Sequence, residues 1–183
     1  AATILGPQQA FAISTSQATS LVERALSDIN STIASGKSGS SLYRAFENIF
    51  ARYADVAVIA RSVLGTDWRR ATNTQRRNFT AAFQTYLARK YGRQFQDYRN
   101  SQITVRRAVS VNSYVEVRAE SVRSGRAPID VTFLVSDRGG SARFFDLRLQ
   151  GASLARTERG EIGAMLDQRR GNIDDLIAHL RTL

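Results

Sequence analysis

Hydrophobic positions recur at helical spacing through the first half of the chain. Four stretches place apolar side chains three or four residues apart, at residues 14–34, 41–53, 55–64 and 72–91. That spacing collects the apolar side chains on one face of a helix. Asp55 has the acceptor side chain of an N-cap, and Thr72 with Gln75 forms the capping-box pattern ahead of the longest stretch. The pattern therefore predicts four helices before residue 92.

After Gly92 the hydrophobic period changes from that of a helix to that of a strand. Apolar and polar side chains alternate in four segments, at residues 103–105, 115–119, 129–135 and 145–149. Sequences rich in Gly, Asn and Ser separate these segments and favour turns. Short alternating strands joined by such turns form antiparallel sheets with one apolar face. The second half of the chain is therefore expected to begin with a meander of four strands.

Two further helices are expected to close the chain, at residues 157–170 and 172–180, the second with Asn172 as its N-cap. Because helices and strands occupy separate parts of the sequence, the fold class is α+β. We expect a single domain over residues 13–183. Its parts are a helical part (13–70), a long basic helix (71–100), an antiparallel sheet (101–151) and C-terminal helices (152–183).

The predicted helices carry more large apolar side chains than one sheet face needs. Such an excess either thickens the core or lines a pocket. Periodicity does not decide between a filled core and a cavity, because it does not measure the volume between elements.

The composition excludes several kinds of chemistry. The chain has no cysteine and only one histidine, His179, so disulfides, thiolate nucleophiles and Cys/His zinc sites are absent. The segment Gly151-Ala-Ser153-Leu-Ala155 comes near the Gly-x-Ser-x-Gly elbow of hydrolases but lacks the second glycine. We therefore predict no catalytic residues, no metal site and no cofactor.

Basic residues concentrate in one part of the sequence. Between Arg69 and Arg107 ten basic residues face Asp97 alone, a net charge of +9 out of the total of +10. Nearly all of these residues are arginines, whose guanidinium groups bind phosphate in bidentate geometry. Nucleic acids, anionic lipid headgroups and acidic proteins are all compatible partners. The pI of about 10.9 keeps a nucleic-acid-binding module as an alternative, although no nucleic-acid motif is present.

The N-terminal residues have features of an export signal. Ala10-Phe11-Ala12 has the small-x-small form of a signal-peptidase site, so residues 1–12 are expected to be a signal remnant or a tail. An ordinary alanine-rich tail explains the same residues. The longest apolar run, Val56 to Ala60, is far shorter than the roughly 20 residues that span a bilayer.

Two stretches of the sequence resemble a known family. The first runs from Asp55 through Leu64-Gly65 and Trp68 to a ladder of Gln75, Phe79, Phe83, Leu87 and Tyr91. The second is Asp146-Leu-Arg-Leu-Gln-Gly151-Ala-Ser153-Leu154, followed by Gly171, Leu176-Ile177 and Leu180. In order and spacing these stretches resemble the toluene-tolerance family of Mla-type periplasmic phospholipid-binding proteins. Gln150 stands where that family usually has glutamate, and Phe144-Phe145 where a tryptophan is common, which leaves the subfamily and its lipid open.

The resemblance implies a periplasmic, monomeric, non-enzymatic carrier. Such a protein would hold phospholipid acyl chains in an apolar cavity between a strongly curved four-stranded sheet and the helices. It would exchange lipid with an outer-membrane lipoprotein complex and with the lipid-binding domain of an inner-membrane ABC transporter. No nucleic-acid partner is implied. Related branches are associated with hopanoid-producing bacteria, so another lipid such as a hopanoid is an alternative ligand.

Eight apolar residues are the expected contacts for acyl chains. They lie on the long helix and on the inner face of the strands: Phe83, Leu87, Val117, Val131, Phe133, Phe145, Leu147 and Leu149. Each of them alone is better explained as plain core, and as a group several are expected to face lipid. Trp68 is expected either at the cavity mouth or as a structural anchor. Asp55 and Asp146 are expected to have structural roles, in helix capping and in pairing with an arginine.

Overall fold

The computed structural model describes residues 13–96 and 101–183, so the expected signal remnant at residues 1–12 lies outside it. The helices are α1 (Thr15–Ala34), α2 (Gly39–Tyr53), α3 (Val56–Leu64), α4 (Asp67–Arg70), α5 (Asn73–Gln96), α6 (Leu154–Gln168) and α7 (Ile173–Leu180). The strands are β1 (Ser101–Val111), β2 (Tyr114–Arg123), β3 (Ile129–Ser136), β4 (Arg143–Leu149) and β5 (Ala152–Ser153). The predicted α+β class is confirmed, since one antiparallel sheet is combined with segregated helices.

The predicted capping residues begin their helices. Asp55 Oδ1 accepts the Val58 amide at 3.2 Å at the start of α3. Before α5, the Gln75 amide donates to Thr72 Oγ1 at 3.1 Å and the Thr72 amide donates to Gln75 Oε1 at 3.0 Å. Asn172 accepts two amides in the first turn of α7. These bonds satisfy amide groups that have no partner inside the helix.

The sheet contains five strands in the order β1-β2-β3-β4-β5 and is open, so the prediction of four strands is wrong. The fifth strand, β5, has two residues and pairs with β4 through Arg148–Ser153 and Leu149–Ala152. It forms because Gln150 and Gly151 both adopt positive φ, 50° and 81°, and reverse the chain in a tight turn. A two-residue strand has no alternation to detect, so the hydrophobic pattern could not reveal it.

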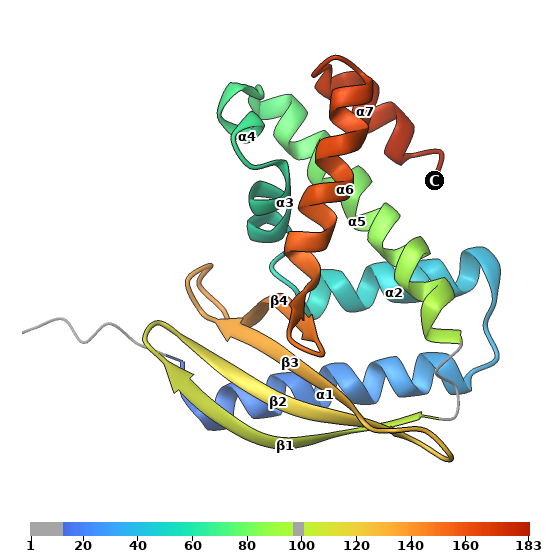
Figure 1. The fold of residues 1–183 in the computed structure, drawn as a ribbon, viewed down its shortest axis with the longest axis vertical. Coiled ribbons are helices and arrows are strands. Elements are labelled where there is room, and N and C mark those ends of the chain that lie inside the picture. Colours follow the sequence, from blue (N-terminus) through green and yellow to red (C-terminus); the bar gives the residue numbers. More distant parts are fainter. Residues whose placement is uncertain (1–12, 97–100) are drawn as a thin grey trace, which may run out of the picture.

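Some helices pack directly against the sheet and others pack only against helices (Figure 1). α1 runs along the sheet and contacts β1 and β2, while α3 and α6 reach β4. α7 packs against α5 at the end of the molecule away from the sheet. None of the helices in the described part of the chain has both the length and the apolar character of a membrane span.

The buried side chains form one continuous cluster, which extends over the helices and the sheet. Where α5, α6 and α7 meet, the apolar side chains are almost fully buried; we call this part the helical core, consisting of Phe79, Ile162, Leu166, Ile173, Leu176, Ile177 and Leu180. On the inner face of the sheet, Val115, Val117 and Val135 are as deeply buried. The helical core and the inner sheet face fix the elements that surround the site described next.

Candidate functional site

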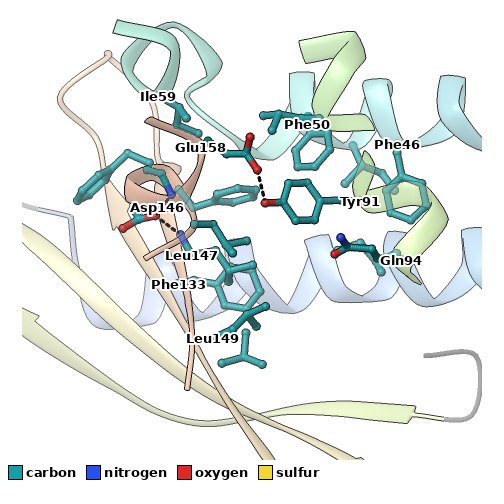
Figure 2. A pocket seen from close by; sticks show the side chains of 18 of the residues that line it. Phe46, Phe50, Ile59, Tyr91, Gln94, Phe133, Asp146, Leu147, Leu149 and Glu158 are labelled. Carbon is teal, nitrogen blue, oxygen red and sulfur yellow. Dashed lines mark hydrogen bonds between the residues drawn. The ribbon is translucent and has the colours of Figure 1, made fainter. Parts of the chain in front are cut away.

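A cavity lies between the inner face of the sheet and helices α1, α2, α5 and α6 (Figure 2). It contains about 1260 Å³ of space free of protein atoms, including the solvent at its mouth. Nearly all of its wall is apolar, and the polar exceptions are few: Tyr91, Gln94, Ser121, Asp146 and Glu158.

Seven of the eight expected acyl-chain residues line this cavity. They come from α5 and from the inner face of β3 and β4: Phe83, Leu87, Val131, Phe133, Phe145, Leu147 and Leu149. The eighth, Val117, does not line it. Its side chain is 0% exposed within the packed part of the sheet, where it is paired with Phe133 and Ala108. The structure thus places the seven residues around one space, and their contact with lipid remains a prediction.

Sequence reasoning missed the part of the wall that α1 and α2 supply. Leu26 and Ile29 of α1 and Phe46, Ile49 and Phe50 of α2 line the cavity. Their helical spacing marked them as an apolar face. The spacing could not show that this face looks onto an open space instead of another packed element.

Aromatic rings form the more rigid part of the wall. Phe133 and Phe144 meet edge to face with their ring centroids 5.8 Å apart. Phe83 stacks on Phe79 of the helical core at 5.6 Å. Because Phe79 is fully buried, the Phe83 ring is held between packed core and cavity. Such pairs limit the rotation of the rings and so help to preserve the shape of the space.

A buried polar cluster joins α5 to α6 at the cavity wall. Glu158 of α6 is only 2% exposed, and its Oε1 accepts both the Tyr91 hydroxyl at 2.6 Å and Lys90 Nζ at 2.7 Å (Figure 2 draws the Tyr91 bond). Lys90 also donates to Glu161 Oε2 at 2.6 Å and to the Tyr86 hydroxyl at 3.2 Å. Its ammonium lies 5.5 and 5.6 Å from the ring centroids of Tyr86 and Tyr91. We call these five residues the polar strut.

The polar strut shifts the ionisation of its members. Burial, reinforced by the hydrogen bond to Glu158, raises the pKa of Tyr91, and burial with the nearby Glu158 charge raises the pKa of Tyr86. Burial alone would lower the pKa of Lys90, but its hydrogen bonds to Glu158 and Glu161 outweigh that effect and raise it. The bond from Lys90 lowers the pKa of Glu161. These four groups therefore keep one protonation state across the neutral range, which suits a structural link better than acid–base catalysis.

Asp146 connects the sheet to the first turn of α6. Its Oδ2 accepts the Ser153 hydroxyl at 2.6 Å, and its Oδ1 accepts the Ala155 amide at 3.0 Å and the Leu147 amide at 2.9 Å. Ser153 also caps α6 by accepting the Arg156 amide. No arginine forms an ion pair with Asp146 among the described residues, so the predicted arginine pairing is wrong. Both carboxylate oxygens instead accept hydrogen bonds from the chain that follows Asp146.

The remaining candidates for chemistry lie outside the cavity. His179 is in the last turn of α7, where a cation is favoured by the helix dipole. Trp68 is half-buried and does not line the cavity; the Arg76 guanidinium lies 5.6 Å from its ring centroid and donates to its backbone carbonyl. Trp68 therefore has the position of a structural anchor. In the part of the chain that the structure describes, no cluster of acidic and histidine side chains could hold a metal ion.

Several basic residues of the 69–107 stretch make contacts within the protein. Arg70 pairs with Asp67 and donates to the Gly171 carbonyl. Arg89 and Arg93 donate to carbonyl groups at the C-terminal end of the chain. Together with Lys90 in the polar strut, these residues use their side chains to join α4 and α5 to later segments. Part of the positive charge of residues 69–107 therefore serves to hold the fold together, through hydrogen bonds and ion pairs within the protein.

Comparison with known proteins gives a family and a related fold. The model of the family described as "MlaC protein" matches residues 19–182, nearly the whole chain. Among solved structures, a phospholipid-binding protein from Ralstonia solanacearum in complex with a phospholipid is similar, with a TM-score of 0.76 and 20% sequence identity. The match covers 90% of this chain and 94% of that chain. At this identity the structural match supports the fold, and the family match stands independently of it.

Proposed function

This chain belongs to the MlaC family, and from that premise we propose that it is a lipid carrier whose cavity holds the acyl chains of a phospholipid. The observation that carries the proposal is the almost wholly apolar cavity between the sheet and helices α1, α2, α5 and α6. The similar protein from Ralstonia solanacearum was solved with a phospholipid bound, which supports the same class of ligand.

An apolar cavity avoids the free-energy cost of exposing acyl chains to water. Burial of each methylene contributes about 0.8 kcal/mol, so an acyl chain of about 15 carbons resists transfer into water by on the order of 12 kcal/mol. A carrier that crosses an aqueous compartment must therefore enclose the chains. Half-buried apolar side chains such as Leu147 and Leu149 line the cavity and can exchange contact with water for contact with lipid.

The proposed role is transport without catalysis. The sequence has no phosphate-binding loop of the form Gly-x-x-x-x-Gly-Lys, so lipid would be received and released by contact with partners. In this proposal the protein works in the periplasm as a monomer. It exchanges phospholipid between an outer-membrane lipoprotein complex and the lipid-binding domain of an inner-membrane ABC transporter. No enzymatic step, cofactor or nucleic acid takes part.

Native mass spectrometry of the purified protein, followed by lipid extraction, tests the proposal. We expect one phospholipid bound per protein, or uptake of one from phospholipid vesicles after the protein has been delipidated. A protein that stays free of lipid in both experiments would contradict the proposal. Recovery of a different lipid class, such as a hopanoid, would keep the carrier and change its cargo.

Two variants that fill the space make the test specific. Val131→Phe and Leu147→Trp enlarge side chains of the cavity wall, and we expect each to reduce loading about tenfold or more. Val58→Trp is the matched control, because Val58 is 45% exposed on α3 and lies outside the cavity. Equal loading of all three variants would show that lipid binds elsewhere. Circular dichroism confirms that each variant is folded.

A further inference from the structure

One hydroxyl of the cavity wall has no partner on the protein. Ser121 of β2 lines the cavity and is 6% exposed. Its cross-strand neighbours, Ile103 and Ile129, are apolar residues of the same wall. The Ser121 hydroxyl makes no hydrogen bond with the described residues, but unlike Ser101 Oγ it is not fully enclosed, so part of it stays accessible. A buried hydroxyl without a partner carries a desolvation cost, which an acceptor on a ligand would remove.

A second polar group of the wall without a partner comes from the last turns of α5. Gln94 lines the cavity, is exposed, and makes no side-chain hydrogen bond within the part of the chain that the structure describes. Figure 2 shows its carboxamide near Tyr91, at the opposite end of the drawn wall from Asp146. Because Gln94 is both exposed and part of the wall, its carboxamide can be reached by a ligand in the cavity.

Ser121 and Gln94 belong to the same side of the molecule. α5 ends at Gln96 and β1 begins at Ser101, and Figure 1 shows these two ends on one side. Ile103, the neighbour of Ser121, follows Ser101 by only two residues. We call Ser121 and Gln94 the polar pair; it marks the end of the cavity at the C-terminal end of α5.

The other polar side chains that line the cavity cannot donate to a ligand. The Tyr91 hydroxyl already donates to Glu158. Asp146 accepts hydrogen bonds on both oxygens, and Glu158 Oε1 accepts two while its Oε2 is enclosed. Ionised carboxylates have acceptor sites only. Among the described side chains of the wall, the polar pair therefore supplies the hydrogen-bond donors that a ligand can use.

The polar part of a phospholipid next to its acyl chains needs such donors. Its two ester carbonyls and its phosphate offer oxygen acceptors and no donor. The phosphate is negatively charged, so it is disfavoured beside the carboxylates of Asp146 and Glu158. A serine hydroxyl and a glutamine carboxamide carry no charge, and each can donate. Charge and hydrogen bonding thus favour the same end of the cavity.

We propose that Ser121 and Gln94 donate hydrogen bonds to oxygen acceptors of the bound lipid, the ester carbonyls or the phosphate. The proposal rests on the lipid-carrier function proposed above and gives the lipid an orientation. Its polar part lies at the C-terminal end of α5, and its acyl chains extend toward Leu154 and Ala155 of α6, which line the cavity as well.

Competition between the wild type and variants for a limited amount of lipid measures the contribution of the polar pair. Isotope-labelled wild type and an unlabelled variant, both delipidated, share vesicles of phosphatidylcholine, and native mass spectrometry counts the loaded fraction of each. Ser121→Ala and Gln94→Met each remove a donor and leave an apolar side chain. We expect each variant to load about fivefold less than the wild type, the effect of one hydrogen bond.

Two forms of the same lipid identify the acceptor. Diester and diether phosphatidylcholine share their phosphate and chain length, but only the diester form has carbonyl oxygens. A loss that is confined to the diester lipid assigns the bond to an ester carbonyl. An equal loss with both lipids assigns it to the phosphate. Either result supports donation by the polar pair.

Matched controls lie outside the cavity. Ser110 is an exposed serine of β1 and Gln168 an exposed glutamine of α6, and neither lines the cavity. Ser110→Ala and Gln168→Met should compete equally with the wild type. Gln94→Glu keeps the shape of an exposed side chain but replaces the donor by a charged acceptor, so it should load no better than Gln94→Met even if Ser121→Ala does not fold.

Two outcomes separate this proposal from the function on which it rests. If Ser121→Ala and Gln94→Met compete equally with the wild type for both lipids, or if Gln94→Glu loads as well as the wild type, the role of the polar pair is overturned while the carrier function stands. A wild-type protein that loads no lipid overturns both.

Discussion

The helical core and the cavity are built from similar side chains but differ in packing. In the helical core, Leu176 and Leu180 are 0% exposed and Ile162 is 1% exposed. Around the cavity, Leu147 and Leu149 are only half-buried, although they are leucines as well. The difference shows that hydrophobicity alone does not decide whether apolar side chains fill a space or surround one.

The neighbouring elements explain the difference. α7 packs against α5 and contacts α6, so its apolar face fills the space between these helices. On the other side of α5 and α6, the cavity lies between these helices and the inner sheet face (Figure 2). The polar strut joins α5 to α6 at this boundary. The cavity is thus maintained by the packing around it.

Truncating one leucine in each region gives the largest expected contrast. Leu176→Ala should lower the free energy of unfolding by about 2–5 kcal/mol, because it opens a new void in a filled core. Leu149→Ala should lower it by less than about 1.5 kcal/mol, because Leu149 already borders open space. Urea denaturation of the delipidated proteins measures both. Equal losses would mean that the cavity wall is packed as tightly as the helical core.

Lipid should stabilise the protein only through the cavity. At a free lipid concentration 100 times Kd, the loaded wild type should gain about 2.7 kcal/mol over the delipidated protein. Leu147→Trp should gain much less, since its indole occupies part of the binding space. Thermal unfolding with and without phospholipid vesicles measures the gain. An undiminished gain in Leu147→Trp would place the lipid outside this cavity.

Removing the joint between β4 and α6 should loosen the wall without emptying the helical core. Asp146→Ala deletes the acceptor for Ser153 and Ala155, with an expected loss of about 1–2 kcal/mol in unfolding free energy. Hydrogen exchange should accelerate first at the Ala155 amide. Asp130→Ala is the matched control, because Asp130 is exposed and its loss should have little effect. Unchanged exchange at Ala155 in the Asp146 variant would show that this joint does not hold α6.

The smallest of these expected effects is a loss of unfolding free energy when acid protonates the polar strut. Because Lys90 lowers the pKa of Glu161 from its ordinary value of 4.5, the stabilising contribution is present above that value and is lost as pH falls through the lowered pKa. Glu161 is 43% exposed in its side chain, so screening should keep the loss below about 1 kcal/mol. Unfolding free energies at a series of pH values between about 3 and 6 measure it. The Glu161→Gln variant should lack this part of the pH dependence, and a full pH dependence there would assign it to other carboxylates.

Much of the fold could be predicted from local patterns. The capping residues Asp55, Thr72, Gln75 and Asn172 act as expected, because the bonds they make reach only two or three residues along the chain. The alternation of residues 129–135 and 145–149 placed Val131, Phe133, Leu147 and Leu149 on one sheet face, and the register confirms that they are cross-strand neighbours. β5 was not predicted, because a strand of two residues has no periodic hydrophobic pattern.

The site was predicted less completely than the fold. Seven of the expected contacts line the cavity: five because alternation specifies the inner face of a sheet, and Phe83 and Leu87 because helical spacing specifies one face of α5. Val117 shares that alternation but lies in the packed part of the sheet, a difference that depends on what covers it. The role of Glu158 had no signal in the sequence, since its partners Tyr91 and Lys90 lie 67 and 68 residues away.

By itself, the sequence determined the α+β class, the helix starts and the apolar faces, because each depends on residues a few positions apart. Only the tertiary structure decided that one apolar face closes into a filled core and another surrounds a cavity. It also decided that both oxygens of Asp146 accept hydrogen bonds whereas Glu158 Oε2 receives none from the described residues. Periodicity specifies the direction in which a side chain points, whereas an empty volume and a missing hydrogen bond depend on the distance between elements far apart in the chain.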